Sequence, residues 1–355
     1  MTAELDQDRA GDTDISNPFF SKREKEFRRW ARENPHLVYE AHPDSLQEGF
    51  EYFFTTRADK LPAERPSVRR IGMFQERGLP KRAIPSIMRT FFNIMRGINA
   101  SWNETNKYLD HLEHQPFEPQ PELWSELSEW VGTRWDDVIL GFTELPSQMI
   151  FKGKSTLFKY AIVVGQEMKK DKIDYAPDYR AGKEVMRVYG SLGLVVNDIA
   201  KWLRKKGVRC QSNHPLGGLT NTTTLAGKAG MGWQGMNGLL ITPKFGQRIR
   251  LAPVFVEHKY FEYTDNRDHD WIENYCKLCR RCEKECPQQA IYSEKIVRMV
   301  DVPGIGQWKT CIDRDKCFDF FWKTLGCSVC VKVCPFSKSE AAYDRLKAVG
   351  EKNRT

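Results

Sequence analysis

Apolar residues recur at helical spacing in several stretches of the chain. The clearest stretch ends before Gly207 and carries apolar side chains three or four positions apart, at Val185, Val188, Leu192, Val196, Ile199 and Leu203. Similar patterns begin after Ser21, at Ile84 and at Leu123, and the last of these ends at Gly132. These patterns predict amphipathic helices, each of which buries one apolar face.

Short continuous apolar runs predict buried strands in the second half of the chain. They lie at residues 158–164, 239–242 and 251–256. From about residue 136 onward the predicted strands alternate with helical patterns. We therefore expect an α/β (α+β) fold in this part of the chain.

The composition changes along the chain and predicts its division into domains. The first 16 residues hold five acidic side chains and almost no apolar ones, which is typical of a disordered tail. Scattered aromatic residues and prolines follow, then the α/β pattern, then a cysteine-rich segment. The predicted parts are a tail at 1–16, a helical and loop-rich extension at 17–135, an α/β domain at 136–265, a cysteine-rich domain at 266–340 and a C-terminal tail at 341–355.

Composition and charge narrow the class of protein. The chain has 355 residues, of which 40% are apolar and 29% are charged, as in ordinary globular proteins. No apolar run approaches the roughly 18 residues that span a bilayer, and the N-terminus lacks a signal sequence, so we expect a cytoplasmic protein. The net charge of +8 is interpreted as a solvated basic surface, because no basic run with interleaved aromatics indicates a nucleic-acid partner.

Two runs of cysteines dominate the C-terminal part. The first is a complete C-x2-C-x2-C-x3-C-P pattern that ends in Pro287, and the second ends in Pro335. This is the pattern of bacterial ferredoxins with two [4Fe–4S] clusters, in which three cysteines of a run bind one cluster and the fourth binds the other. We expect one cluster on Cys276, Cys279, Cys282 and Cys334, and the second on Cys286, Cys317, Cys327 and Cys330.

The second run is irregular, because nine residues separate Cys317 from Cys327. Cys311 is a rival for the same position, and Cys317 is preferred because an aromatic segment follows it. Zinc is the alternative metal, although zinc sites usually show two separated pairs of ligands. Structural disulfides would require an oxidising compartment. Cys210 and Cys311 remain outside the predicted ligand sets and are expected to be free thiols that are buried or semi-buried.

A glycine-rich segment precedes the cysteines. Gly230, Gly232 and Gly235 have the spacing of a dinucleotide-binding turn, but no strand directly precedes them and a strand, not a helix, follows. The better interpretation is close approach of the backbone to a large flat cofactor.

From about residue 160 to residue 338 the chain resembles the cobalamin-dependent reductive dehalogenases and the related epoxyqueuosine reductases. The matching segments occur in the same order as in those enzymes: Ala161-Ile-Val-Val-Gly-Gln-Glu-Met168, the helix of Tyr189, Trp202-Leu-Arg-Lys-Lys-Gly207, Ala229-Gly-Met-Gly232, Leu240-Ile-Thr-Pro-Lys-Phe-Gly246, Arg250-Leu251 and the two cysteine runs. About half of the chain is covered, and residues 1–150 match only loosely.

The resemblance implies a nitroreductase-like domain that binds a base-off corrinoid, followed by a ferredoxin-like domain with two [4Fe–4S] clusters. It places Tyr189 where the dehalogenases have a proton-donating tyrosine, with Arg250 beside it to stabilise the phenolate. Asn213 or His214 takes the position of a polar residue that contacts substrate. Corrinoid contacts are implied for Gly230, Gly232, Leu240, Thr242, Phe336 and Lys338.

The sequence also departs from both groups of enzymes. Trp233 and Met236 are closer to the epoxyqueuosine reductases, yet the aspartic acid that those enzymes use is missing between Cys210 and Gly230. Their C-terminal helical repeats are not found after Cys334 either. We expect an oxidoreductase that removes a halide or similar group from a small molecule, with electrons from an external ferredoxin or flavodoxin. The alternatives are a reductase of a modified nucleoside and a non-catalytic electron carrier.

Overall fold

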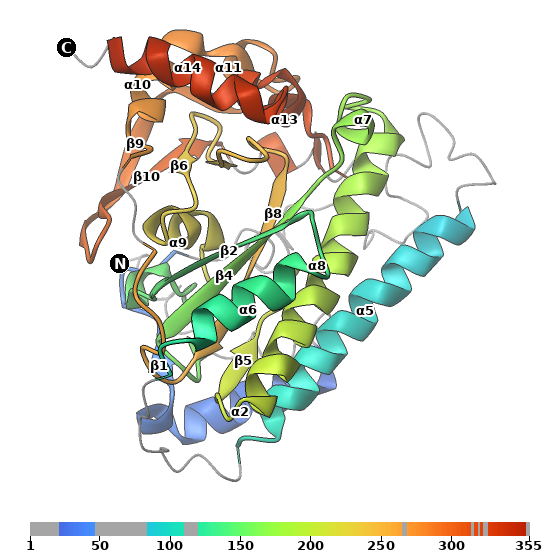
Figure 1. The fold of residues 1–355 in the computed structure, drawn as a ribbon, viewed down its shortest axis with the longest axis vertical. Helices are drawn as coiled ribbons and strands as arrows, with labels where there is room; N and C mark the ends of the chain where they lie inside the picture. Colours follow the sequence, from blue (N-terminus) through green and yellow to red (C-terminus); the bar gives the residue numbers. More distant parts are fainter. Residues whose placement is uncertain are drawn as a thin grey trace, which may run out of the picture.

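An antiparallel four-stranded sheet forms the centre of the protein (Figure 1). The computed structural model describes residues 21–46, 84–109, 120–264, 268–313, 316–318, 320–321 and 326–352. The strand order is β2-β4-β8-β5, with the bounds Val138–Glu144, Tyr160–Glu167, Ile249–Val256 and Cys210–Ser212. Every neighbouring pair is antiparallel; β4 pairs with β8 over its full length and with all of β2.

Helices α6 (Leu123–Gly132) and α8 (Tyr179–Lys205) cover one face of this sheet. Side chains alternate across a strand, so the even-numbered Ile162, Val164 and Val254 point to this face and join the core with α8. Asp178 caps the N-terminus of α8, and its carboxylate accepts a hydrogen bond from the backbone N–H of Arg180. Each fully buried aliphatic side chain at this interface stabilises the fold by about 1.5–3 kcal/mol.

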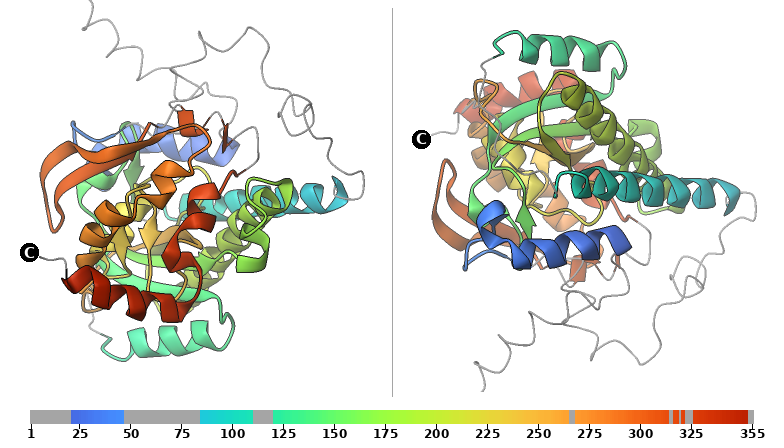
Figure 2. Two further views of the ribbon diagram at one scale, coloured as in Figure 1. Left: turned by 90° about the horizontal axis from the view of Figure 1, so that it is seen from above. Right: turned by 90° about the horizontal axis from the view of Figure 1, so that it is seen from below.

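Helices α2 (Lys22–Glu33) and α9 (Thr222–Lys228) lie on the opposite face, where odd-numbered strand residues such as Ala161 and Phe255 are buried. Figure 2 shows α2 and α6 on opposite sides of the sheet in both views. Short elements complete this layer: η1 (Pro35–Leu37), β1 (Tyr39–Glu40), which pairs with β3 (Ser155–Thr156), and η4 (Ser147–Met149).

Helix α5 (Ile84–Asn106) packs along α8, and small residues bring the two helices close together. A Cβ at Gly190 would lie 3.5 Å from the side chains of Asn93 and Ile94. The ring of His214 fills a slot between Gly97 and Gly193: a Cβ at Gly97 would lie 2.9 Å from the ring, and one at Gly193 would overlap it. Glycines are therefore required at both positions for the histidine to enter the interface.

The cysteine-rich part covers one end of the sheet and contains α10 (Trp271–Cys279), α11 (Arg281–Lys284), α13 (Val329–Val333), η5 (Pro335–Ser337) and α14 (Glu340–Lys352) (Figure 1). A long hairpin, β9 (Ile291–Val302) and β10 (Gly306–Ile312), lies between the two cysteine runs. Its Trp308 is buried in the core of the α2 side and donates a hydrogen bond of 2.6 Å from Nε1 to Oγ1 of Thr224. The hairpin thus fastens the cysteine-rich part to the α/β part.

The expected mixed α/β fold and the predicted helices are confirmed. Ser21 caps α2, α5 begins at Ile84, and α6 ends at Gly132. The predicted strand at residues 158–164 begins two residues later and runs to Glu167. Residues 341–352, predicted as a tail, belong to α14, whose Tyr343 packs against Trp271. The predicted tail at 1–16 lies outside the described residues.

The hairpin β9–β10 and strand β2 were not predicted, and α7 (Lys170–Ile173) is a further short helix. No helix in the described part of the chain is both long enough and apolar enough to cross a membrane. The predicted domain boundaries stay a prediction.

Candidate functional site

The cysteines predicted as ligands lie near one another in the cysteine-rich part of the chain. Burial raises the pKa of the Cys334 thiol, and nearby Cys276, Cys282 and Cys279 raise it further. Burial likewise raises the pKa of Cys317 to about 12, with added contributions from Cys330, Cys327 and Cys286. Cys282 also lies near Cys330, whose charge raises the pKa of the Cys282 thiol after the larger effect of burial. The division of the eight cysteines between two clusters therefore stays a prediction.

Cys317 and Cys311 lie in different places. Cys317 is grouped with Cys327 and Cys330, whereas Cys311 is buried behind the turn that contains Gly235, whose carbonyl oxygen is 3.7 Å from its sulfur. Cys311 is also one of the residues that raise the pKa of Cys276, after burial, which acts most strongly. Cys311 therefore lies on the side of Cys276.

Backbone conformation explains how cysteines so close in sequence can face one point. Arg280 adopts the left-handed conformation with φ 48°, which ends α10 after Cys279 and starts α11 before Cys282. Ser328 does the same with φ 57° between Cys327 and Cys330. These residues turn the chain within each run so that successive thiols converge.

The chemistry of these donors suits iron–sulfur clusters. All ten cysteines are free, and burial keeps several of the thiols protonated when no cation is near. Iron binds the thiolate and supplies the positive charge that a buried thiolate requires. Within the described residues no three His, Cys, Asp or Glu side chains converge closely enough to hold a single metal ion.

Tyr189 and Arg250 lie against each other near Cys330. The guanidinium carbon of Arg250 is 5.0 Å from the centre of the Tyr189 ring, which is a cation–π contact. The same guanidinium is close enough to Cys330 to lower the pKa of that thiol, against the stronger effect of burial, which raises it. Nε of Arg250 is buried and has no hydrogen-bond partner among the described residues.

The two polar candidates that follow β5 are both buried. Oδ1 of Asn213 accepts a hydrogen bond of 2.9 Å from the backbone N–H of Leu219, so this side chain stabilises its own loop. Nδ1 of His214 accepts one of 3.0 Å from the backbone of Leu216, which leaves the proton on Nε2. That Nε2 is buried and without a partner in the described part of the chain.

The environment of His214 predicts a pH-dependent stability. Burial lowers its pKa to about 4, so the folded protein keeps this side chain neutral. Above pH 6.5 the imidazole of His214 is neutral in both the folded and the unfolded protein. As the pH falls from about 6.5 to about 4, the imidazole is protonated in the unfolded chain but not in the folded protein. The free energy of unfolding therefore falls by about 3 kcal/mol over this range. Urea unfolding of wild type and His214→Gln across this range is expected to show a smaller loss in the variant.

His36→Gln is the matched control, because His36 is exposed and its loss should leave the pH dependence of wild type unchanged. Equal slopes in wild type and His214→Gln would contradict a neutral buried His214.

The residues predicted to contact a corrinoid are divided between the interior and the surface. Leu240, Thr242 and Phe336 are buried: Phe336 packs against Trp271 and Tyr275, and Oγ1 of Thr242 bonds to the backbone of Gly246. Gly230 and Gly232 have positive φ angles in the glycine-rich segment, and Lys338 is exposed. Their role toward a corrinoid stays a prediction.

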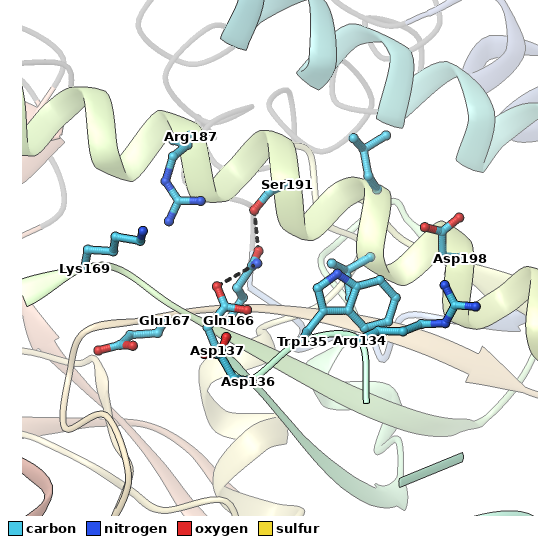
Figure 3. A pocket seen from close by; sticks show the side chains of 12 residues that line it. Arg134, Trp135, Asp136, Asp137, Gln166, Glu167, Lys169, Arg187, Ser191 and Asp198 are labelled. Carbon is cyan, nitrogen blue, oxygen red and sulfur yellow. Dashed lines mark hydrogen bonds between the residues drawn. The ribbon is translucent and has the colours of Figure 1, made fainter. Parts of the chain in front are cut away.

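A polar pocket of about 600 Å³ lies between α8 and the ends of β2 and β4 (Figure 3). Arg187 and Ser191 of α8 line it, whereas Tyr189, two positions from each, points to the other side of the helix. Gln166 lies between this pocket and the Tyr189–Arg250 pair. Its side chain forms hydrogen bonds with Ser191 and Asp137, and Gln166 is paired with Arg250 in the register of β4 and β8. Gln166 lies in one of the segments that resemble the two groups of enzymes, but its neighbours on the sheet could not be predicted, because strand register sets them.

Comparisons with known proteins connect both parts of the chain to reductases. The family described as a 4Fe-4S dicluster domain matches residues 275–338. The tetrachloroethene reductive dehalogenase of Desulfitobacterium hafniense is 32% identical over 194 residues, which cover 51% of this chain and 34% of that protein. The epoxyqueuosine reductase of Listeria monocytogenes is 29% identical over 136 residues, which cover 38% of this chain and 34% of that protein.

The predicted resemblance to these two groups of enzymes is confirmed. The structure of the catabolic reductive dehalogenase NpRdhA in complex with 3-bromo-4-hydroxybenzoic acid has the same fold over 60% of this chain and 32% of that one, with a TM-score of 0.52 and 19% identity. The chain spans about a third of the length of these relatives. The dehalogenase and the epoxyqueuosine reductase named above are both oxidoreductases.

Proposed function

We propose that this protein is an iron–sulfur reductase in which two [4Fe–4S] clusters deliver electrons to a corrinoid beside Tyr189. The observation that carries the proposal is the position of Arg250, which is stacked on the Tyr189 ring and lies near Cys330. The side chain of Arg250 is thus close both to Tyr189, the candidate acid, and to Cys330, a predicted ligand of the second cluster.

Arg250 fits a ligand rich in hydrogen-bond acceptors. Its Nε is a buried donor without a partner among the described residues, and such a donor costs about 1–3 kcal/mol. The amide side chains of a corrinoid, or a substrate above it, would satisfy it. A corrinoid in its reduced state supplies the electron pair that displaces a leaving group from carbon.

The protein's own residues handle the proton. Tyr189 transfers its hydroxyl proton to the carbon from which the leaving group departs. Arg250 then stabilises the phenolate that remains, since a guanidinium beside an oxyanion favours the charged form. His214 stays neutral through its burial and presents an N–H toward the α5–α8 interface, on the same side of α8 as Tyr189.

The substrate we propose is a small halogenated molecule, with a separate ferredoxin or flavodoxin as electron donor. The similarity to tetrachloroethene reductive dehalogenase supports this choice. A second candidate is a reductase of a modified nucleoside in RNA, which the similarity to epoxyqueuosine reductase and the residues Trp233 and Met236 favour.

The test is reconstitution of the full chain with iron, sulfide and cobalamin under anaerobic conditions, followed by metal analysis and a visible spectrum. We expect about eight irons and one cobalt per chain and a base-off corrinoid spectrum. Aryl and alkyl halides and an epoxyqueuosine-containing RNA stem-loop are then compared as substrates. Eight irons without cobalt would refute the corrinoid enzyme and leave an electron carrier.

A further inference from the structure

Helix α5 carries a group of exposed apolar side chains on its N-terminal half. The exposed fractions are 61% for Met88, 57% for Phe91, 66% for Phe92 and 37% for Met95. Single exposed apolar residues are ordinary on a protein surface, whereas a contiguous group of them marks a surface that meets a partner. We call these four residues the α5 patch.

The α5 patch continues an apolar stripe that is buried in the second half of the same helix. Ile98 and Trp102 follow Met95 at helical spacing and pack in the core of the α2 side, where the ring of Trp102 lies 5.2 Å from that of Phe27. The protein therefore covers this stripe at one end of α5 and leaves it open at the other. Figure 2 shows the open end of α5 extending beyond the neighbouring helices in both views.

Two arginines flank the α5 patch. Helix positions advance by about 100° per residue, which places Arg89 and Arg96 next to Phe92, on the side of the patch away from Phe91. Both arginines are exposed, and neither forms a salt bridge with a residue that the structure describes. The sequence contains no acidic residue from 84 to 103. The helix thus contributes apolar side chains and positive charge to this surface, and no negative charge.

This combination favours an anionic bilayer over a second copy of the chain or another protein. A twofold pairing of the patch would bring four arginines to one interface, where like charges repel each other. A protein partner would require a groove that fits a protruding helix, whereas lipid chains adapt to it. Arginine side chains extend their guanidinium groups to lipid phosphates while neighbouring aromatic rings lie among the acyl chains.

We propose that the α5 patch, with Arg89 and Arg96, attaches the protein to the surface of membranes that contain anionic phospholipids. Helix α5 lies in the plane of the surface, with the patch inserted below the head groups and the two guanidinium groups bound to phosphates. The attachment is peripheral, because the second half of α5 stays packed in the protein. The inference is independent of the proposed clusters and corrinoid, since α5 contains none of the residues proposed to bind them.

The test is co-sedimentation of the full chain with vesicles of phosphatidylcholine alone and of phosphatidylcholine mixed with phosphatidylglycerol. We expect wild type to bind the anionic vesicles more tightly, and less so at high ionic strength. Phe91→Ser/Phe92→Ser should lower the partition coefficient about tenfold or more, because two aromatic rings no longer leave water. Arg89→Gln/Arg96→Gln should lower it about fivefold for each arginine on anionic vesicles and leave binding to neutral vesicles unchanged.

Arg29→Gln and Val349→Ser are the matched controls. They remove an exposed charge from α2 and an exposed apolar side chain from α14, so vesicle binding should stay at the wild-type value. Thermal unfolding checks that every variant folds. Wild type that binds neither kind of vesicle, or Phe91→Ser/Phe92→Ser that binds as wild type does, would overturn the inference. Concentration-dependent dimers that this double substitution abolishes, without vesicle binding, would overturn it in favour of a second copy.

Discussion

Cys317→Ala is expected to remove about four iron atoms per chain from the reconstituted protein, whereas Cys311→Ala should leave the iron content unchanged. The physical reason is position: Cys317 is one of four neighbouring thiols with Cys286, Cys327 and Cys330, and a cluster that loses one of its four protein ligands is not retained. Iron and acid-labile sulfide analysis of the two purified variants, beside wild type, is the measurement.

The two substitutions form a matched pair. Each removes one sulfur near the cysteine runs. Cys311 is buried and Cys317 is half-buried, so the cost in packing is at least as large in Cys311→Ala, and the loss of a ligand is what distinguishes Cys317→Ala. Thermal unfolding of the iron-free chains checks that both variants fold. Loss of four irons in Cys311→Ala and not in Cys317→Ala would move the second cluster to a different ligand set.

Local sequence patterns were sufficient to predict the elements that depend on residues close together in the sequence. Helix α8 was predicted from the spacing of its apolar residues and from Gly207 just beyond its end. The cysteine runs were recognised from the short, fixed gaps between their cysteines. The hairpin β9–β10 was missed because its Trp308 is buried by contacts with Thr224 and the α2 side of the sheet, which are distant in sequence.

The contacts of the candidate site depend on tertiary structure in the same way. Arg250 meets Tyr189 because β8 lies beneath α8, and Gln166 adjoins both regions because of its register with β8. The glycines show the limit of sequence interpretation most clearly. Their spacing resembles a phosphate-binding turn, yet Gly235 is required because the amide of Gln247 lies where its Cβ would be.

Tyr189→Phe is expected to lower turnover by about 10²–10⁴-fold while both clusters and any corrinoid remain bound. Phenylalanine retains the aromatic ring on which Arg250 is stacked, so the cation–π contact and the helix packing persist. Only the hydroxyl proton is lost. The measurement is the rate of substrate-dependent oxidation of a reduced dye, together with the metal content and the visible spectrum of the same sample.

Tyr179→Phe provides the control, since it removes a hydroxyl from the first residue of the same helix, ten positions and ~15 Å away. Its turnover should equal that of wild type. If Tyr189→Phe retains wild-type turnover with unchanged metal content, Tyr189 is a packing residue of α8, and the proton must come from another donor or from water. A loss of turnover accompanied by loss of cobalt would instead assign Tyr189 to cofactor binding. The proton-transfer role thus requires the combination of full metal content, an unchanged spectrum and a slow reaction, because removing the hydroxyl affects only the step in which carbon is protonated.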